Sequence, residues 1–217
     1  MRATAPGRGM DPVRRVAKPV TFVLCLLPAL AMVLDAATGH LAVNPIQELI
    51  NRTGLWAVRL LLVTLAVTPL RRLPRMGWLI RLRRMLGLYA FFYALAHLLV
   101  YLVLNQGLVP ALILADLGRP YILAGYAAVA LLIPLAVTST DGMMRRLGRR
   151  WKRLHRLVYP AAILAVAHYL MLVKLDLRPP LTYAGLLALL LGWRLVRYAA
   201  RRLRRHRAQQ AGQRSPG

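Results

Sequence analysis

Six long apolar runs divide this sequence, and each is long enough to cross a lipid bilayer as a helix. A helix needs about 20 mostly apolar residues to span the hydrocarbon core of a membrane. Prolines or charge clusters mark most boundaries between the runs, as expected at helix ends. We therefore predict an all-α membrane protein, a six-helix transmembrane bundle, with spans Pro19–Ala36, Gly54–Leu70, Met85–Leu104, Pro120–Thr138, Leu157–Val173 and Pro180–Tyr198.

The composition excludes an ordinary water-soluble enzyme. Apolar residues make up 59% of the chain and charged residues 17%, whereas soluble domains have about 45–50% and about 25%. The single cysteine, Cys25, excludes an intrachain disulfide and a Cys-rich metal site, and its apolar surroundings predict an inert buried thiol. The sequence has neither a GxGxxG nor a Walker motif, and the connections between runs are short. We therefore expect any chemistry to take place inside the bundle.

The charge is strongly basic, with 31 Lys and Arg against 6 Asp and Glu. Such a balance often indicates nucleic-acid binding, but these residues form short clusters between apolar runs, so we expect no nucleic-acid partner. One side of the predicted topology carries 26 of the basic residues and the other side 4. The positive-inside rule then places both termini in the cytoplasm, with the basic clusters near anionic lipid headgroups. We expect a basic N-terminal segment (1–18), a membrane domain (19–198) and an Arg-rich tail (199–217).

Two histidines fall inside predicted spans, where ionisable side chains are costly and often functional. From a helical rise of about 1.5 Å per residue, His97 lies roughly 18 Å and His168 roughly 17 Å from the cytoplasmic start of its span. Both spans run outward, so the two imidazoles are expected at one level in the outer half of the bilayer. There they could supply both axial ligands of a haem iron. The alternatives are hydrogen bonds between helices and binding of a metal ion by these histidines alone.

Arg83 and His155 form a second level, nearer the cytoplasm. Arg83 precedes His97 by close to four helical turns, so the two point to similar faces. His155 is turned roughly 140° from His168 on an ideal helix, although Pro160 between them can disturb that helix. Three roles stay open for His155: ligand of a second haem, a group that orients a flavin or quinone, or a solvated side chain.

Arg59 is a further charge inside a predicted span. It lies about 7 Å below the outer surface, near the level of the histidine pair. There it could bind the propionates of a haem, or extend to the outer headgroups. His40 and His206 fall in an external loop and in the tail, where we expect surface roles.

Four segments of the chain, in the same order, resemble one family of membrane proteins. They are NPIQELINRTGLWAVRLLLVTLAVTPLRR (44–72), RRMLGLYAFFYALAHLLVYLVL (83–104), RPYILAG (119–125) and TSTDGMMRRLGRRWKRLHRLVYPAAILAVAHYLMLVK (138–174). The family is that of the haem-binding membrane subunits of the periplasmic protein-methionine-sulfoxide reductase system, MsrQ or YedZ. It belongs to the ferric-reductase-like, NADPH-oxidase-like transmembrane group.

The resemblance implies a bacterial inner-membrane protein with six helices around haem b. By matching position, it implies that His97 and His168 are the axial haem ligands and that His155 is a third functional histidine, a further candidate ligand. Electrons would pass to a separate periplasmic molybdenum-cofactor reductase of the MsrP type, which repairs methionine sulfoxide in envelope proteins. The implied donors are the quinone pool or a cytoplasmic flavin reductase, and FMN is attributed to the family.

The chain departs from the wider oxidase group in two ways. Those relatives use four histidines for two stacked haems, whereas Arg83 stands at the fourth position here, so we expect one haem. They also carry a fused flavin and NADPH domain that this sequence lacks. The donor is therefore expected to be external and to dock at the basic face near Trp78, Arg83, Trp151 and His155, attracted by its charge.

The expected protein is thus a non-catalytic electron-transfer subunit. Two other interpretations stay open. One is a cytochrome b or ferric reductase subunit that serves another acceptor. The other is a small proton-coupled transporter with relay histidines. It is disfavoured because the spans hold no carboxylate except Asp35, next to the end of the first span, and the halves show no inverted repeat.

Overall fold

The computed structural model describes residues 16–173 and 175–213, and all regular structure in that part of the chain is helical. Six helices are long and apolar enough to cross a membrane, which confirms the predicted fold class. These are α1 (Lys18–Ala37), α2 (Pro45–Leu70), α3 (Arg83–Leu99) with its π-helical continuation η3 (Val100–Asn105), α5 (Pro120–Val137), α8 (Val158–Leu172) together with the helical segments at 149–157 before it, and α9 (Arg178–Gln213) as far as Arg204. The predicted basic residues before position 16, Lys174 and Arg214 lie outside the described residues.

Short helical segments connect the long helices. They are α4 (Pro110–Asp116), α6 (Asp141–Leu147), α7 (Arg149–Leu154) and the 3-10 turns η2 (Gly77–Arg81) and η4 (His155–Leu157). Proline stands in the first turn of α2, α4 and α5, where its missing N–H leaves no helical hydrogen bond unmade. The side chain of Asn44 caps α2 by accepting from the N–H of Gln47.

Two predicted boundaries differ clearly from the observed ones. Helix α2 begins at Pro45, well before the predicted start at Gly54, because Asn44 and Pro45 together start the helix before the apolar run. Helix α9 continues beyond the predicted end of the last span, through most of the Arg-rich tail, to Gln213. The 3-10 turn η4 precedes Pro160, and this proline cannot donate to the carbonyl one turn before it.

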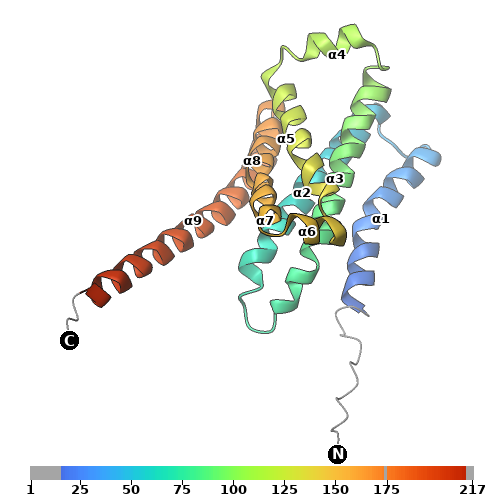
Figure 1. The fold of residues 1–217 in the computed structure, drawn as a ribbon. Helices are drawn as coiled ribbons and strands as arrows, with labels where there is room; N and C mark the ends of the chain where they lie inside the picture. Colours follow the sequence, from blue (N-terminus) through green and yellow to red (C-terminus); the bar gives the residue numbers. More distant parts are fainter. Residues whose placement is uncertain (1–15, 174, 214–217) are drawn as a thin grey trace, which may run out of the picture.

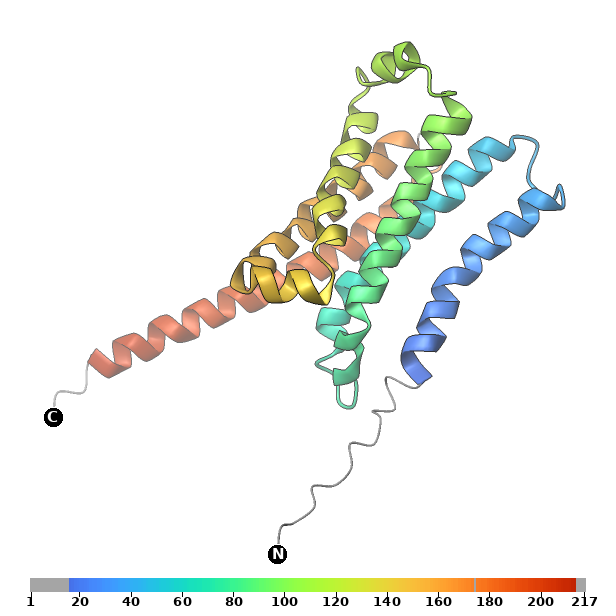
Figure 2. The same ribbon diagram turned by 45° about the vertical axis from the view of Figure 1, so that its right-hand side comes forward.

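Two antiparallel helix pairs build the centre of the bundle: α2 packs along α3, and α5 packs along α8. Helices α1 and α9 lie at the periphery (Figures 1 and 2). Helix α1 begins and α9 ends toward the side of the bundle that carries α6 and α7, whereas α4 caps the opposite end. We call these the α6–α7 end and the α4 end. That the α6–α7 end is cytoplasmic stays a prediction from the distribution of basic residues.

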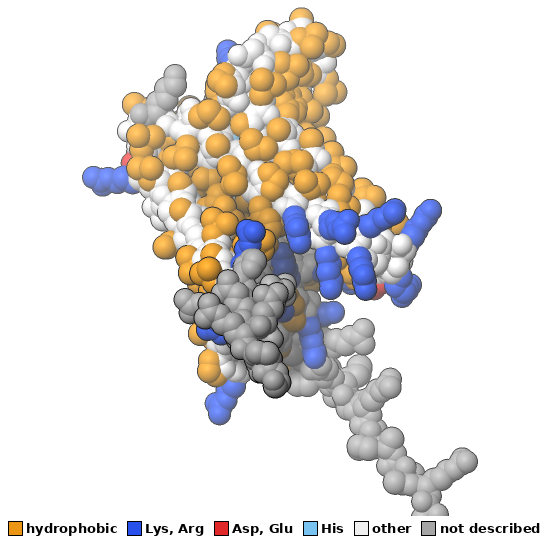
Figure 3. All heavy atoms as spheres, turned by 60° about the vertical axis from the view of Figure 1, so that its left-hand side comes forward, with side chains coloured by type: hydrophobic (Ala, Val, Ile, Leu, Met, Phe, Trp, Pro, Cys, Tyr) orange, Lys and Arg blue, Asp and Glu red, His pale blue; other side chains and the backbone are white. Residues whose placement is uncertain are grey.

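The outer surface is apolar where a membrane would surround it. Large side chains such as Phe22, Leu189 and Leu195 are exposed on α1 and α9. Figure 3 shows apolar side chains over most of one face, with many Lys and Arg side chains gathered below them. Apolar exposure on this scale is unfavourable in water and suits lipid, so the chain is a multi-pass membrane protein.

Small and aliphatic side chains close the interior. Leu65, Ala161 and Ala162 are fully buried between α2 and α8. Tyr93 is also buried, and its hydroxyl donates to the carbonyl of Cys25 and accepts from the N–H of Ala29. In a regular helix the N–H of Ala29 would donate to the carbonyl of Cys25. The Tyr93 hydroxyl replaces that hydrogen bond of α1 by bonding to both groups. Tyr93 thus attaches the loosely packed α1 to the centre of the bundle, and Cys25 is buried as predicted.

Candidate functional site

A pocket of about 770 Å³ lies between the two helix pairs. Its size falls within the range of roughly 300–1,000 Å³ that is typical of ligand and cofactor sites. Mostly aliphatic side chains from α2, α3, α5 and α8 line it, and it reaches the α4 end of the bundle. Both predicted membrane histidines, His97 and His168, are among the lining residues, and we call this space the histidine pocket.

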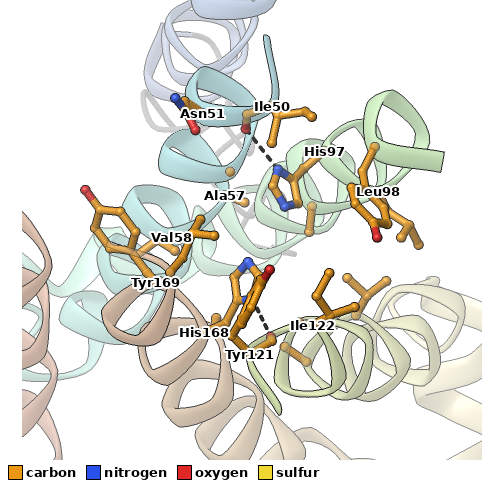
Figure 4. Close-up of a pocket in the computed structure, with 18 of the residues that line it drawn as sticks. Ile50, Asn51, Ala57, Val58, His97, Leu98, Tyr121, Ile122, His168 and Tyr169 are labelled. Atoms are coloured by element: carbon orange, nitrogen blue, oxygen red, sulfur yellow. Dashed lines mark hydrogen bonds between the residues drawn. The ribbon is translucent and has the colours of Figure 1, made fainter. Parts of the chain in front are cut away.

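The imidazoles of His97 and His168 face each other across the pocket, which confirms that they lie at one level. Their ring centres are 6.1 Å apart and their planes make an angle of 76°. His97 comes from α3 and His168 from α8, one from each helix pair. In Figure 4 the nitrogen of each ring that makes no hydrogen bond points toward the other ring.

A backbone carbonyl anchors each of these rings. The Nδ1 atom of His97 donates to the carbonyl of Ile50 in α2 at 2.9 Å. The Nδ1 atom of His168 donates to the carbonyl of Tyr121 in α5 at 2.6 Å. A carbonyl can only accept, so Nδ1 carries the proton and Nε2 of each neutral ring keeps a free lone pair. Each ring therefore makes the hydrogen bond between helices that the alternative interpretation predicts, His97 to α2 and His168 to α5, and these bonds use only Nδ1 of each ring.

This geometry suits a single metal atom bound between the two imidazole nitrogens. Two imidazole–metal bonds of about 2 Å, plus about 1 Å from each ring centre to its nitrogen, give about 6 Å between ring centres. The observed separation is 6.1 Å. Among the described residues, no three His, Cys, Asp and Glu side chains come together as metal ligands. Two opposed imidazoles in a large apolar pocket fit a flat metal macrocycle better than a bare ion.

Polar side chains gather where the histidine pocket meets the α4 end. Asp116, at the end of α4, is buried and accepts hydrogen bonds from Tyr101 and Gln106. Arg119 lies 3.3 Å from the same carboxylate, and Arg52 on α2 also lines the pocket. Sequence reasoning missed this group, because the carboxylate lies outside the six spans and reaches the pocket only through the fold of α4.

Arg59 lies outside the histidine pocket. Its Nε atom donates to the hydroxyl of Tyr183 in α9 at 2.9 Å, and its guanidinium lies over the ring of Trp56. Gly54 of α2 contacts His97, so Arg59, five residues further along that helix, lies about 7 Å beyond the level of the histidine pair. The described contacts of Arg59 therefore hold α9 against α2, and Arg52 and Arg119 are the arginines that reach the pocket.

His155 and Arg83 also lie outside the histidine pocket. His155 stacks on Trp151 with ring centres 3.9 Å apart, and its Nδ1 atom lies 3.2 Å from the carbonyl of Trp151. Its Nε2 atom is buried, and the backbone of Leu135 also acts on the ring. The charge of Arg83 acts electrostatically on His155. The predicted second level therefore exists, but it is a separate site.

Arg194 in α9 completes this second site. One of its amino groups donates to the carbonyl of Leu65 at 2.6 Å, and its guanidinium lies 5.0 Å from the ring centre of Tyr159. The Nε and Nη1 atoms of Arg194 are buried with no partner in the described part of the chain. Arg83 acts electrostatically on Arg194 as well as on His155. We call Arg83, His155 and Arg194 the Arg194 cluster.

The sequence carried a signal for Arg194 that was not used. Arg194 falls inside the last predicted span, Pro180–Tyr198, and so meets the criterion that singled out Arg59. Elsewhere, His40 is exposed and hydrogen-bonds Thr38, as expected of a surface residue. The side chain of His206 is among those the structure does not describe.

Comparison with known proteins agrees with this architecture. Residues 53–166, which include His97 and end two residues before His168, match the family model of the ferric reductase like transmembrane component. A protein-methionine-sulfoxide reductase heme-binding subunit MsrQ from Xanthomonas oryzae pv. oryzae is 49% identical over 201 residues, 89% of this chain and 92% of its own length.

Two further relatives have the same description. The one from Xanthomonas axonopodis pv. citri is 56% identical over 162 residues, 74% of each chain. The one from Ralstonia nicotianae is 48% identical over 185 residues, 83% of this chain and 85% of its own. With a family model over half of the chain and such relatives over most of it, the chain belongs to the MsrQ family of ferric-reductase-like transmembrane proteins.

Proposed function

We propose that this protein is the haem b electron-transfer subunit of a methionine sulfoxide reductase system in the bacterial inner membrane. The observation that carries this proposal is the facing pair His97 and His168, with both Nδ1 atoms held by carbonyls and both Nε2 atoms aimed into one apolar pocket. The relatives' description as heme-binding subunits supports the same cofactor here.

Each part of the pocket has a distinct task in this proposal. His97 and His168 would hold the haem iron from opposite sides, and the haem supplies reversible one-electron redox chemistry. The carbonyls of Ile50 and Tyr121 fix the tautomer and the orientation of both rings by accepting their Nδ1 protons. The aliphatic lining excludes water, and Arg52 and Arg119 present cations at the α4 end, where haem propionates need partners.

The acceptor is proposed to dock at the α4 end. The histidine pocket extends to Asp116 and Arg119 there, so an electron has the shortest path out of the bundle beneath α4. A periplasmic molybdenum-cofactor reductase of the MsrP type is the proposed acceptor. This assignment rests on the family and on the predicted orientation, in which the α4 end faces the periplasm.

The donor side is proposed to lie at the Arg194 cluster. Arg83 acts electrostatically on both His155 and Arg194 there, and the buried donors of Arg194 need acceptor oxygens. A quinone carbonyl, a flavin phosphate or the carboxylate of another cofactor offers such oxygens. The quinone pool or a cytoplasmic flavin reductase would deliver electrons at this end, and FMN is the flavin that the family suggests.

The first experiment is a dithionite-reduced minus oxidised absorption spectrum of protein purified in detergent, with a pyridine haemochrome assay. We expect sharp b-type α and Soret bands and close to a single haem per chain. A well-folded but colourless protein from haem-replete cells would overturn the proposal and favour a transporter. If the assay gave two haems per chain, the Arg194 cluster would be the candidate site of the second haem.

Ligand variants then test the residues. His97→Ala and His168→Ala should each abolish haem retention, because each variant removes one of the two imidazole nitrogens that would hold the iron. Arg83→Ala is the matched control: it removes a charged side chain of the same helix outside the histidine pocket, and most of the haem should remain. A full haem complement in His97→Ala would show that the ligand assignment is wrong. Electron transfer from quinol vesicles and from a reduced flavin reductase, measured separately on the loaded protein, identifies the donor.

A further inference from the structure

Gly54 lies directly against the imidazole of His97. A Cβ atom built on Gly54 would lie 2.9 Å from Nδ1 of that ring, closer than real Cβ atoms come to their neighbours, and 3.1 Å from Cε1, which is a tight contact. Gly54 follows Ile50 by one turn of α2, and the carbonyl of Ile50 accepts the Nδ1 proton of His97. In an α-helix the carbonyl of residue i points toward the N–H of residue i+4. The imidazole therefore reaches the Ile50 carbonyl only by passing over the Cα atom of residue 54.

The second histidine repeats this arrangement on the other helix pair. A Cβ atom on Gly125 would lie 3.0 Å from Nδ1 and 3.1 Å from Cε1 of His168. Gly125 follows Tyr121 by one turn of α5, and the carbonyl of Tyr121 accepts the Nδ1 proton. In both pairs the histidine comes 47 residues after the carbonyl that it binds. The pocket thus has an internal repeat that the sequence analysis did not detect.

We propose that Gly54 and Gly125 are positioning residues that set the planes and directions of the two ligand imidazoles. Because glycine has no Cβ atom, each of these positions leaves a space in the helix surface. The imidazole lies in that space, and its Nδ1 atom donates to the carbonyl of the residue one turn earlier. The inference rests on the proposed function, since it concerns how His97 and His168 meet the haem iron.

An added methyl group displaces both rings: at residue 54 it clashes with His97, and at residue 125 it forces the ring of His168 to shift by a few tenths of an ångström. Moving the imidazole of His97 away from residue 54 lengthens its hydrogen bond to Ile50 and turns Nε2 from the pocket axis. Rotation of the ring in place would change the angle of 76° between the two imidazole planes. That angle is observable, because nearly perpendicular axial imidazoles leave two iron d orbitals close in energy and give ferric haem a strongly anisotropic low-spin electron paramagnetic resonance signal.

The test compares Gly54→Ala and Gly125→Ala with the matched control Gly87→Ala. Gly87 also lies in a membrane helix, but a Cβ there would meet only the methyl group of Thr64 at an ordinary 3.7 Å. We expect the strongly anisotropic signal in the unmodified protein and in Gly87→Ala. The other two variants should show a shifted or split signal and roughly tenfold to hundredfold weaker haem retention, as for loss of the groups that orient a metal ligand. Unchanged signal and retention in both variants would overturn the inference.

A second measurement needs no haem. In the apoprotein, Gly54→Ala should lower the thermal unfolding midpoint when His97 is present and raise it in the His97→Ala background, where the methyl group fits and alanine favours the helix. Equal effects in the two backgrounds would refute a contact between Gly54 and the ring. If the unmodified protein bound no haem, the proposed function would fail, and this coupling would still decide whether the glycine holds the imidazole.

Discussion

Replacing Arg194 with methionine separates two explanations of its buried, unpaired donors. In the unloaded protein, the hydrogen bond to Leu65 is worth about 1.5–3 kcal/mol, and the contact with Tyr159 is worth about 1–2 kcal/mol. Against these, the two buried N–H groups of Arg194 without partners cost about 1–3 kcal/mol each. The terms nearly cancel, and methionine has a similar length, so Arg194→Met should change the unfolding free energy of the unloaded protein by about 1 kcal/mol or less.

The loaded protein should behave differently. A group that places two acceptor oxygens on Nε and Nη1 makes two charge-assisted hydrogen bonds, and their loss costs about 3 kcal/mol or more. For a chain of this size that is a fall of about 6–12 °C in the unfolding midpoint.

The assay is thermal unfolding in detergent, before and after the cofactors and quinone are removed. Arg197→Met is the matched control, because Arg197 also lies over an aromatic ring, that of Trp193, but is exposed. A loss above about 3 kcal/mol in the unloaded variant would show that the N–H groups are already satisfied. Equal midpoints in the loaded proteins would refute a ligand on Arg194.

Two further predictions concern other described contacts. Tyr93→Phe removes the hydroxyl that bridges Cys25 and Ala29; α1 should re-form its own hydrogen bond, so the variant should lose about 1 kcal/mol, and thermal unfolding that shows a much larger loss would contradict this bridging role. The guanidinium of Arg84 donates to Asp141 and holds the pKa of that carboxyl below its usual value. Asp141→Asn should therefore be slightly less stable above pH ~4 and equal to the parent below the lowered pKa. A difference in unfolding midpoint that stays constant with pH would contradict the ion pair.

Much of the architecture follows from local properties of the sequence. Hydropathy over about 20 residues predicts a span wherever it occurs, and counting the helical rise placed His97 and His168 at one level before their contacts were known. The tail was predicted less well, because α9 continues through residues whose hydropathy ends the span but whose helix-forming Arg, Leu and Ala favour a helix.

The tertiary structure alone decided which polar groups meet. Rotation about each helix axis and the packing of neighbouring helices direct a side chain, and neither is encoded in the hydropathy of its own span. Arg59 was expected beside the histidine pair and instead binds Tyr183, whereas Asp116 reaches the pocket from outside the spans. The carbonyl of Ile50 and the missing Cβ of Gly54 act on His97 from another helix. The sequence by itself determined the depth of the two histidines, because depth depends on position along one helix; the direction of their rings depends on contacts between helices.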